Sequence, residues 1–468
     1  MTAQHTGPSP GGAGTEEVDV VVLGMGPGGE QVAGSLAEAG WDVVGVEAEL
    51  VGGECPYWAC VPSKMMIRAG NALAEAHRVG QLAGTARVYS DWEPVATRIR
   101  EEATTDWDDQ IAADRFRGKG GRLLRGRGRL VGPGRVRVGE RTLAARHGVV
   151  LATGTEPAVP PVPGLRDTPY WTNRQAVSAT TPPGSLLVLG GGAIGVELAQ
   201  AFARFGTSTT VVESAPSLLP AEEPEVGAVL EEVLREERIE VRTGSRAVGV
   251  EHDGKAFALT LDNGERLVAD RLLVATGRRA RLADVGLETV GLDPETRLLE
   301  TDGRMRAGDG LWAVGDVTEH GGFTHMALYQ ADIAVRTLLG QDGPPADYRA
   351  APRVTFCDPE VGAVGLTERQ ARDRGLDVRT GSADLPSVAR GWIHRTGNEG
   401  LIKLVADADR GLLVGATSMG PMGGEVLYGL AVAVRAELPV ELLRDLPFAY
   451  PTFHRGVEDA LDDLVSSG

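Results

Sequence analysis

The sequence predicts an α/β protein in which one strand–helix–strand unit occurs twice. Two observations predict this fold class. Each unit opens with a short apolar run, the pattern of a buried parallel strand, and each run leads directly into a glycine-rich turn and a helix. A chain of 468 residues is too long for one hydrophobic core, so we expect two to four domains.

The first unit begins with the strand Val18–Leu23, which runs into the turn Gly24-Met25-Gly26-Pro27-Gly28-Gly29. A helix is predicted from about Glu30 to Ala39, and a second strand, Asp42 to Val46, ends in Glu47. Glycines at Gly24, Gly26 and Gly29 make the tight turn and let the backbone approach a pyrophosphate at the helix N-terminus. Because an acid follows about 20 residues later, where it can take a ribose hydroxyl, the unit predicts dinucleotide binding.

The second unit repeats this pattern. A strand, Leu186–Leu189, runs into glycines at positions 190, 192 and 195, and a helix follows from about Ile194 to Phe205. The next strand, Thr209–Val212, ends in Glu213. Two complete units predict two dinucleotides, between which a hydride could pass. A carboxylate at Glu213 accepts a hydrogen bond from a free 2′-hydroxyl and repels a 2′-phosphate, so we predict NADH in preference to NADPH.

Two of the three cysteines in the chain, Cys55 and Cys60, lie close together between the units. Five residues of ideal helix separate Cα atoms by roughly 8.7 Å, whereas a disulfide tolerates at most about 7 Å. If they pair, the backbone must be irregular, which Pro56, Pro62 and the preceding glycines favour. Such a pair in a turn that leads into a helix favours redox chemistry, because a helix N-terminus stabilises a thiolate.

A zinc site and an inert structural pair are the two alternative roles for these cysteines. Half a zinc site requires further ligands, but only Cys357 and eight scattered histidines remain, so we expect no metal. An inert structural pair is the second alternative. Cys357 lies in a strand-like apolar stretch and is interpreted as a buried passive thiol.

Composition limits the partners and the location. The formal net charge of −18 argues against nucleic acid, and the locally basic stretch from Arg115 to Arg146 is interpreted as a solvated strand surface. No apolar run reaches the roughly 18 residues of a membrane span. Residues 1–17 are interpreted as a disordered tail without a secretory signal. Three cysteines without such a signal predict a cytoplasmic location.

Taken in order, several motifs resemble the class I pyridine nucleotide-disulfide oxidoreductases, the flavoproteins that include lipoamide dehydrogenase, glutathione reductase and mercuric reductase. The segment GGECPYWACVPSK, Gly52–Lys64, resembles the redox motif GGTCxNxGCxPSK of the family. The other matching segments are the two strands that end in Ala-Thr-Gly, Val149–Gly154 and Leu272–Gly277, the FAD motif Ala313–Asp316, and Gly362–Glu368, which opens a segment like the dimerisation domain.

The resemblance implies an α/β protein with two Rossmann-like dinucleotide-binding domains, for FAD and NAD, plus a C-terminal α+β interface/dimerisation domain. The FAD-binding domain would span residues 18–165 and 290–345, and the NAD(H)-binding domain residues 166–289. The interface domain would span residues 350–468. It further implies a homodimer.

The resemblance also implies a path for electrons. NADH would reduce the flavin, and the flavin would reduce a Cys55–Cys60 disulfide, with Cys60 as the thiolate next to the flavin and Cys55 as the thiol that attacks substrate. Lys64 would lie beside the flavin, with Glu197 as its ion-pair partner. The implied cofactor-binding residues are Gly24, Gly26, Gly29, Glu47, Gly53, Thr153, Gly154, Asp316, Ala327, Gly190, Gly192, Gly195, Glu213 and Gly277.

The chain departs from the family near its C-terminus. The disulfide reductases carry His-Pro-Thr-x-x-Glu, whereas this chain has Tyr450 at the histidine and Arg455 at the glutamate. Tyrosine is a poor base at pH 7 but can donate a hydrogen bond to a leaving thiolate. His454 would lie one helical turn after Tyr450 if a helix begins after Pro451, and a packing or solvent-facing histidine is the alternative.

These features predict an FAD-dependent enzyme that passes electrons from NADH to a small-molecule or protein thiol/disulfide substrate other than glutathione or lipoamide. Trp58, beside the cysteines, suggests a substrate pocket unlike those of the named relatives, and packing under the flavin is the alternative. One alternative is an NADH:quinone or metal-ion reductase, although the chain lacks the C-terminal cysteine pair of mercuric reductase. Another is a redox-sensing flavoprotein with low turnover.

Overall fold

The computed structural model describes residues 14–466, which divide into two compact units. The first unit contains the described residues up to Tyr57, Thr104–Glu156 and Arg278–Asp347. The second contains Trp58–Ala103, Pro157–Gly277 and the described residues from Tyr348 onward. Residues 1–13 of the predicted tail lie outside the described part, but residues 15–17 are in a strand, so the tail was predicted too long. The predicted domain boundaries remain a prediction.

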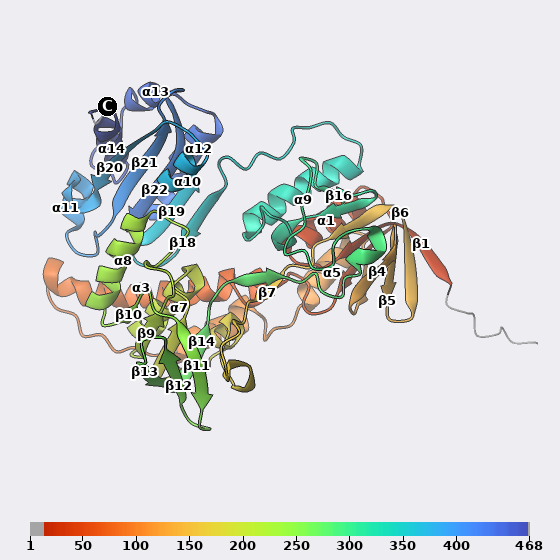
Figure 1. The fold of residues 1–468 in the computed structure, drawn as a ribbon, viewed down its shortest axis with the longest axis horizontal. Helices are drawn as coiled ribbons and strands as arrows, with labels where there is room; N and C mark the ends of the chain where they lie inside the picture. Colours follow the sequence, from red (N-terminus) through yellow and green to blue (C-terminus); the bar gives the residue numbers. More distant parts are fainter. Residues whose placement is uncertain (1–13, 467–468) are drawn as a thin grey trace, which may run out of the picture. The chain divides into compact units, whose positions relative to one another are not determined.

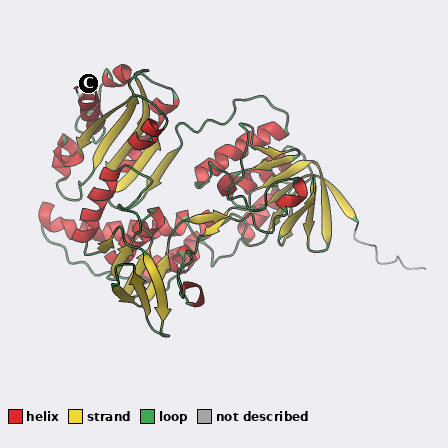
Figure 2. Cartoon of the chain, viewed as in Figure 1, coloured by secondary structure: helices red, strands yellow, loops and turns green. Residues whose placement is uncertain are grey.

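The first unit is built on an eight-stranded sheet whose central strands are parallel (Figures 1 and 2). Along its main path the order is β16-β17-β6-β1-β2-β3, and β4 and β5 continue from β6 as antiparallel strands. The strands are β1 (Thr15–Leu23), β2 (Val43–Glu47), β3 (Arg122–Arg125), β4 (Gly128–Gly132), β5 (Arg135–Val138), β6 (Arg141–Leu151), β16 (Arg306–Gly308) and β17 (Leu311–Ala313). All five residues of β2 are buried, as expected for a central parallel strand.

Three helices of this unit matter for the site. Helix α1 (Pro27–Glu38) follows β1, and α9 (Thr324–Leu338) packs against α1. Helix α1 begins at Pro27, earlier than predicted, because proline suits the first helical position, where no N–H bond is needed. The short helix α2 (Glu54–Tyr57) follows Gly52 and Gly53. The remaining α-helix of this unit is α5 (Gln110–Gly118).

The second unit contains a four-stranded parallel sheet in the order β10-β9-β8-β14. These strands are β8 (Ser185–Leu189), β9 (Ser208–Val212), β10 (Glu240–Arg242) and β14 (Arg271–Val274). Its helices are α7 (Ala193–Arg204) and α8 (Pro224–Glu236), and an antiparallel sheet adds β11 (Ala247–His252), β12 (Phe257–Leu261) and β13 (Arg266–Ala269). The strand–helix–strand motif that the sequence predicts twice is therefore present once in each compact unit.

The second unit also contains a five-stranded antiparallel sheet near the C-terminus, in the order β18-β19-β22-β21-β20 (blue in Figure 1). Its strands are β18 (Pro352–Thr355), β19 (Glu360–Gly365), β20 (Val378–Asp384), β21 (Leu401–Asp407) and β22 (Leu412–Gly420). Helices α12 (Gly423–Arg435) and α14 (Arg455–Ser466) share one apolar core with this sheet. The predicted α+β domain is confirmed.

Helix α3 (Cys60–Leu82) is a helix of 23 residues in the second unit, and it packs against α7. The remaining α-helices and strands are α4 (Glu93–Arg98), α6 (Asn173–Val177), α10 (Glu368–Asp373), α11 (Ala389–His394), α13 (Val440–Arg444), β7 (Thr155–Pro157) and β15 (Arg278–Ala280). Among residues 14–466, none of the helices combines the length and the apolar composition needed to cross a bilayer.

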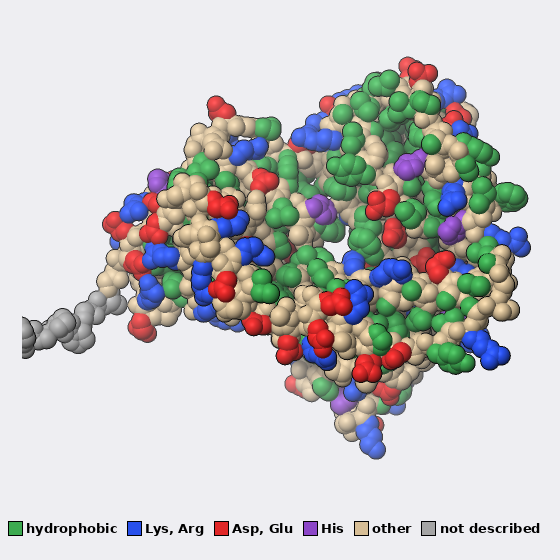
Figure 3. Space-filling view, turned by 180° about the vertical axis from the view of Figure 1, so that it is seen from behind, with side chains coloured by type: hydrophobic (Ala, Val, Ile, Leu, Met, Phe, Trp, Pro, Cys, Tyr) green, Lys and Arg blue, Asp and Glu red, His purple; other side chains and the backbone are tan. Residues whose placement is uncertain are grey.

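Several arginines of the basic stretch from Arg115 to Arg146 form ion pairs at the surface of the first unit. Arg125 pairs with Asp109 at 2.7 Å, and Arg141 pairs with Glu16 at 2.6 Å. On the face drawn in Figure 3, acidic and basic side chains are interspersed. This arrangement agrees with the interpretation of the stretch as a solvated surface.

Candidate functional site

The first glycine turn is a backbone arrangement that side chains would break. Gly24 has φ +92°, and a Cβ there would lie 2.3 Å from the carbonyl oxygen of Ala152. A Cβ at Gly29 would lie 2.0 Å from the carbonyl oxygen of Gly24. Because both distances are far below contact, only glycine allows α1 to start this close to β1 and β6.

Gly53, at the start of the redox segment, packs against the same turn. It has φ +68°, and a Cβ there would lie 2.8 Å from Cα of Gly26. Gly26 is the N-cap residue of α1. Because glycine has no side chain, Gly26 does not cap the amides of the first helical turn. The amides of that turn therefore suit a pyrophosphate, as predicted for the FAD-binding turn.

Glu47 is buried at the end of β2 and binds the glycine turn. Its carboxylate accepts hydrogen bonds from the N–H of Met25 and the N–H of Glu49, both at 2.7 Å. Burial raises the pKa of Glu47. The carboxylate thus supports the turn directly, while its predicted bond to a ribose stays a prediction.

Two other predicted FAD residues, Thr153 and Asp316, follow the ends of β6 and β17, and a third, Ala327, is on α9. Thr153 donates its hydroxyl hydrogen bond to the carbonyl of Arg281 at 2.9 Å. Asp316 accepts a hydrogen bond from the Thr155 hydroxyl at 2.9 Å. Ala327 on α9 lies close against α1, because a Cβ built at Gly28 would be only 3.3 Å from the Cβ of Ala327. The carboxyl ends of parallel strands are where such folds bind ligands.

The second glycine turn repeats this geometry. Gly190 has φ +114°, and a Cβ there would lie 2.4 Å from the carbonyl oxygen of Ala275. A Cβ at Gly195 would lie 1.9 Å from the carbonyl oxygen of Gly190. Glu213 accepts hydrogen bonds from the N–H of Gly191 at 2.6 Å and from the N–H of Ala215 at 2.7 Å. Each glutamate therefore holds the turn of its own nucleotide-binding fold.

The glycines of the second turn leave room for a ligand. Gly192 is the N-cap residue of α7, and among the described residues no atom lies within 4 Å of a Cβ built there. Gly277, at the end of the second Ala-Thr-Gly strand, has φ +109° and is equally open within the described part of the chain. The residues present in both turns fit the phosphates of a dinucleotide.

The redox segment is irregular, as the sequence predicts. Helix α2 contains Cys55, helix α3 begins at Cys60, and Ala59 between them has φ −133° and ψ −102°. Cys55 is half-buried and Cys60 is exposed. The boundary between the two units falls between Tyr57 and Trp58, so each cysteine is described with its own unit. A cysteine at the first position of a long helix is well placed to ionise.

Lys64 and Glu197 form the predicted ion pair, with 2.7 Å between Nζ and Oε2. Lys64 is four residues after Cys60 on α3, so both project from the same face of this helix. The other oxygen of Glu197 accepts a hydrogen bond from the N–H of Phe356 at 2.8 Å, and the Lys64 ammonium lies 4.8 Å from the centre of the Phe356 ring. Phe356 was not among the residues predicted for the site.

Trp58, between the cysteines, contacts two neighbours that the sequence did not single out. The side-chain amide of Asn173 donates a hydrogen bond to the carbonyl of Trp58 at 2.7 Å. The guanidinium of Arg174 lies 5.3 Å from the centre of the Trp58 ring. Both partners come from the start of α6.

Cys357 is buried, as predicted, but it follows β18 instead of lying within a strand. Its Sγ contacts the carbonyl of Pro359 at 3.2 Å. Burial raises the pKa of this thiol well above its usual value. A protonated, buried thiol supports the interpretation of Cys357 as passive.

His454 would lie one helical turn after Tyr450 only if a helix began after Pro451, and this condition is not met. Helix α14 begins at Arg455, after a tight turn in which the N–H groups of Gly456 and Val457 bond to carbonyls three residues back. Since these bonds join residues 453–457 and the α-helix begins only at Arg455, Tyr450 and His454 do not share a face of one regular α-helix. Tyr450 is 72% exposed, and His454 is exposed as well.

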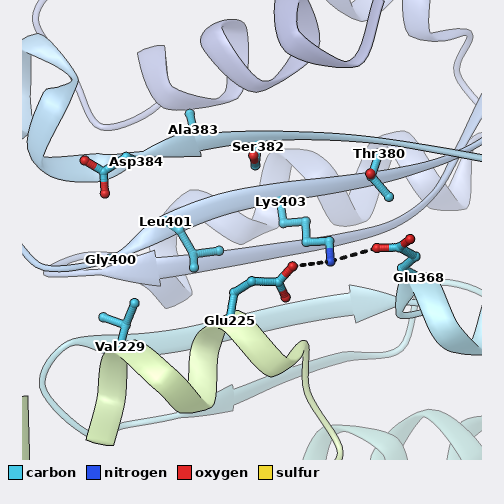
Figure 4. A pocket seen from close by; sticks show the side chains of 10 residues that line it. All are labelled: Glu225, Val229, Glu368, Thr380, Ser382, Ala383, Asp384, Gly400, Leu401 and Lys403. Atoms are coloured by element: carbon cyan, nitrogen blue, oxygen red, sulfur yellow. Dashed lines mark hydrogen bonds and ion pairs between the residues drawn. The ribbon is translucent and has the colours of Figure 1, made fainter. Parts of the chain in front are cut away.

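The second unit also contains a cavity of about 300 Å³ between α8 and the antiparallel sheet (Figure 4). Lys403 from β21 is buried there and contacts the carboxylates of Glu225 at 2.7 Å and of Glu223 and Glu368 at 3.0 Å. None of the ten lining residues is among those predicted for catalysis or cofactor binding.

Comparison with known proteins places these features in a family. Residues 18–331 match the family model described as pyridine nucleotide-disulphide oxidoreductase, and residues 351–461 match the dimerisation domain of that family. The chain is 31% identical to a mercuric reductase of Staphylococcus aureus over 456 residues, which is 94% of this chain and 81% of the relative. It is 33% identical to a dihydrolipoyl dehydrogenase of Thermus scotoductus over 465 residues, or 95% and 97% of the two chains.

Solved structures give the same result. The HOCl-induced flavoprotein disulfide reductase RclA from Escherichia coli superposes with a TM-score of 0.81 at 26% identity, covering 96% of this chain and 99% of RclA. LpdA from Mycobacterium tuberculosis superposes with a TM-score of 0.81 at 25% identity, covering 96% and 99% of the two chains.

Proposed function

Because the chain belongs to the pyridine nucleotide-disulphide oxidoreductase family, whose enzymes use FAD and NAD(P)H, we propose that it carries electrons from NADH through FAD to the Cys55–Cys60 pair. The electrons then reach a thiol/disulfide substrate. The observation that carries the proposal is the placement of Cys60 and Lys64 on one face of α3, with Lys64 bound to Glu197 at 2.7 Å.

The residues of the chain have distinct tasks in this proposal. The turns at Gly24 and Gly190 hold the pyrophosphates of FAD and NADH. When bound at these turns, FAD would relay two electrons from NADH to the disulfide. Lys64, paired with Glu197 at 2.7 Å, would supply a positive charge to the flavin. Cys60 stays ionised at the start of α3. Cys55 leaves the reduction as a thiol, and it would attack the substrate disulfide as a thiolate, with its proton passing by way of Tyr450 or His454 to the leaving substrate thiolate.

The preference for NADH is part of the proposal. Glu213 is buried at the end of β9, and its charge repels the 2′-phosphate of NADPH. The residues that follow it, Ser214 and Ala215, offer no positive charge. A free ribose hydroxyl can instead donate to the remaining lone pairs of this carboxylate.

We propose a substrate other than glutathione or lipoamide, because Tyr450 replaces the histidine that acts as acid and base in those reductases. Tyr450 or His454 would donate a proton to the leaving thiolate. Activity of Tyr450→Ala and of His454→Ala separates them: loss of disulfide turnover in only one variant identifies the donor.

A homodimer in the cytoplasm completes the proposal. The chain carries the dimerisation domain of the family, and large apolar side chains are exposed in this region. On α12, Tyr428 and Val432 are 73% and 51% exposed and lie four residues apart on one face. Size-exclusion chromatography with light scattering tests this: a monomer at micromolar concentration would contradict it.

A second candidate function is reduction of a metal ion. Mercuric reductases are among the relatives, and RclA has been solved as a Cu(II) complex. Reduction of a quinone directly from the flavin is the related alternative. Replacement of Cys55 by serine separates disulfide reduction from quinone reduction, because disulfide reduction would vanish while quinone reduction would survive.

The decisive experiment is an anaerobic titration of the holoenzyme with NADH. The proposal expects a long-wavelength absorption band from a Cys60 thiolate next to the oxidised flavin, and Cys60→Ser should lack this band. A wild-type enzyme without the band contradicts the redox role of the pair. Failure of NADH to reduce FAD within seconds would instead favour a low-turnover sensor.

A further inference from the structure

The loop between the two cysteines is held by side chains at two consecutive carbonyls. In the second unit, the Asn173 amide donates to the Trp58 carbonyl at 2.7 Å. In the first unit, the Trp107 indole N–H donates to the Tyr57 carbonyl at 3.2 Å. A loop of four residues thus has two of its backbone acceptors fixed by partners distant in sequence.

Asn173 is presented by a rigid element. It is the first residue of α6, it is 6% exposed, and Thr172 caps the helix with a reciprocal bond to Gln175. Trp171, just before the helix, pairs with β14 through hydrogen bonds to Leu272 and Val274. The helix that carries the Asn173 amide is therefore hydrogen-bonded to the parallel sheet, which restricts the position of this amide.

Arg174 adds a contact to the side chain of the same tryptophan. Its guanidinium lies 5.3 Å from the centre of the Trp58 ring, within the distance of a cation–π interaction. Asn173 thus fixes the backbone of Trp58, and Arg174 fixes its ring. Two consecutive residues of α6 hold one residue of the redox loop.

We propose that Asn173 and Arg174 are positioning residues that preorganise the loop for the Cys55–Cys60 disulfide. The inference rests on the proposed function. In the step concerned, a hydride equivalent from NADH breaks the S–S bond and leaves one thiol and one thiolate. Preorganisation raises the effective concentration of one sulfur at the other, which stabilises the disulfide against this reduction.

Loosening the loop should therefore make the disulfide easier to reduce. For Asn173→Ala we expect the equilibrium constant for disulfide formation to fall about tenfold, which corresponds to a rise of about 30 mV in reduction potential. Arg174→Met should shift the potential in the same direction, and Arg174→Lys should restore part of it because a cation over the ring is kept. Trp107→Phe tests the bond from the first unit and should also raise the potential.

Two matched controls are available in the second unit. Asn398 donates its amide to the carbonyl of Gly391 at 2.9 Å, and Arg390 lies 5.6 Å from the centre of the Phe453 ring. Asn398→Ala and Arg390→Met remove the same kinds of contact away from the cysteines and from α6. Both should lower stability without moving the potential.

The potential is measured by equilibrating the holoenzyme with known ratios of oxidised and reduced dithiothreitol and counting alkylated cysteines by mass. If the wild-type pair is never found as a disulfide, the proposed function fails. If the wild type titrates but Asn173→Ala and Arg174→Met match the controls, or shift to lower potential, only the present inference fails. Should Asn173→Ala not fold, Arg174→Met, whose target is a half-buried side chain, decides alone.

Discussion

Lys64 and Glu197 lie 2.7 Å apart although 133 residues separate them in the sequence, and the second oxygen of Glu197 binds the N–H of Phe356. One buried carboxylate therefore connects α3, α7 and the strand end at the antiparallel sheet. Neutralising Glu197 alters the charge next to Lys64, while removing its oxygens also leaves the Phe356 N–H without this acceptor.

The first prediction compares two substitutions of Glu197. Glu197→Ala should be less stable than Glu197→Gln by about 1–3 kcal/mol, because glutamine can still accept the Phe356 hydrogen bond and alanine leaves a donor unpaired. Both should slow reduction of bound flavin by NADH. Urea unfolding and stopped-flow flavin absorbance measure the two effects. Glu102→Gln is the control, because Glu102 pairs with Arg98 on the surface and should cost below about 1 kcal/mol.

The second prediction concerns the buried lysine in Figure 4. Burial lowers the pKa of Lys403, but Glu225, Glu368 and Glu223 more than reverse this, so its pKa is raised. Lys403→Met should lower the free energy of unfolding by about 3–5 kcal/mol at pH 7, because the buried carboxylate of Glu223 and the partly exposed carboxylates of Glu225 and Glu368 lose their cation. Lys119→Met removes a half-buried surface partner of Glu38 and should cost below about 1 kcal/mol.

This effect should depend on pH with a definite sign. The pKa of Glu368 is lowered, chiefly by the hydrogen bond from Lys403. Its contribution to stability is present above the unfolded value of about 4.3 and is lost as pH falls through the folded pKa. The raised pKa of Lys403 keeps its own contribution until pH rises above about 10. The difference between wild type and Lys403→Met should therefore shrink below about pH 4, and a difference that grows in acid would contradict the assignment.

The third prediction uses the two glycine turns. Gly29→Ala places a Cβ 2.0 Å from the Gly24 carbonyl, and Gly195→Ala places one 1.9 Å from the Gly190 carbonyl. The first should lower the FAD content of the purified protein, and the second should retain FAD but weaken NADH binding. Flavin absorbance and NADH titration measure these effects.

A helical glycine supplies the control. Gly80 in α3 has, among the described residues, no atom within 4 Å of a built Cβ. Gly80→Ala should therefore leave both cofactors in place and stabilise the protein by about 0.5–1 kcal/mol through helix propensity. Equal loss of FAD in all three variants would show that the turns have no specific role.

The predictable parts of the site are those that backbone geometry determines. A turn between a strand and a helix that brings Gly24 against Ala152 admits little besides glycine, so its spacing is readable in the sequence. The Lys64–Glu197 contact was predictable only through the resemblance. Asn173 was not predictable, because its bond to Trp58 joins residues 115 positions apart and asparagine is common in turns.

The sequence left the arrangement of Tyr450 and His454 open. Pro451 suits the first turn of a helix, and a helix that began after it would have placed His454 one turn after Tyr450. The chain instead buries Phe453 in the core of the antiparallel sheet and forms i-to-i+3 bonds before α14 begins at Arg455. Tertiary packing of one aromatic residue therefore outweighed the local preference.

The last prediction concerns cofactor choice. Glu213→Gln removes a negative charge but keeps an oxygen that can accept from the N–H of Gly191, which now lies 2.6 Å from the carboxylate. The ratio of kcat/KM for NADH to that for NADPH should fall on the order of tenfold, equivalent to about 1.4 kcal/mol, because repulsion of the 2′-phosphate is lost. Glu47→Gln, the same change in the first unit, is the matched control: it should affect FAD content and leave the ratio unchanged. A wild-type ratio that favours NADPH, or a Glu213→Gln ratio equal to that of wild type, would contradict the assigned role of this carboxylate.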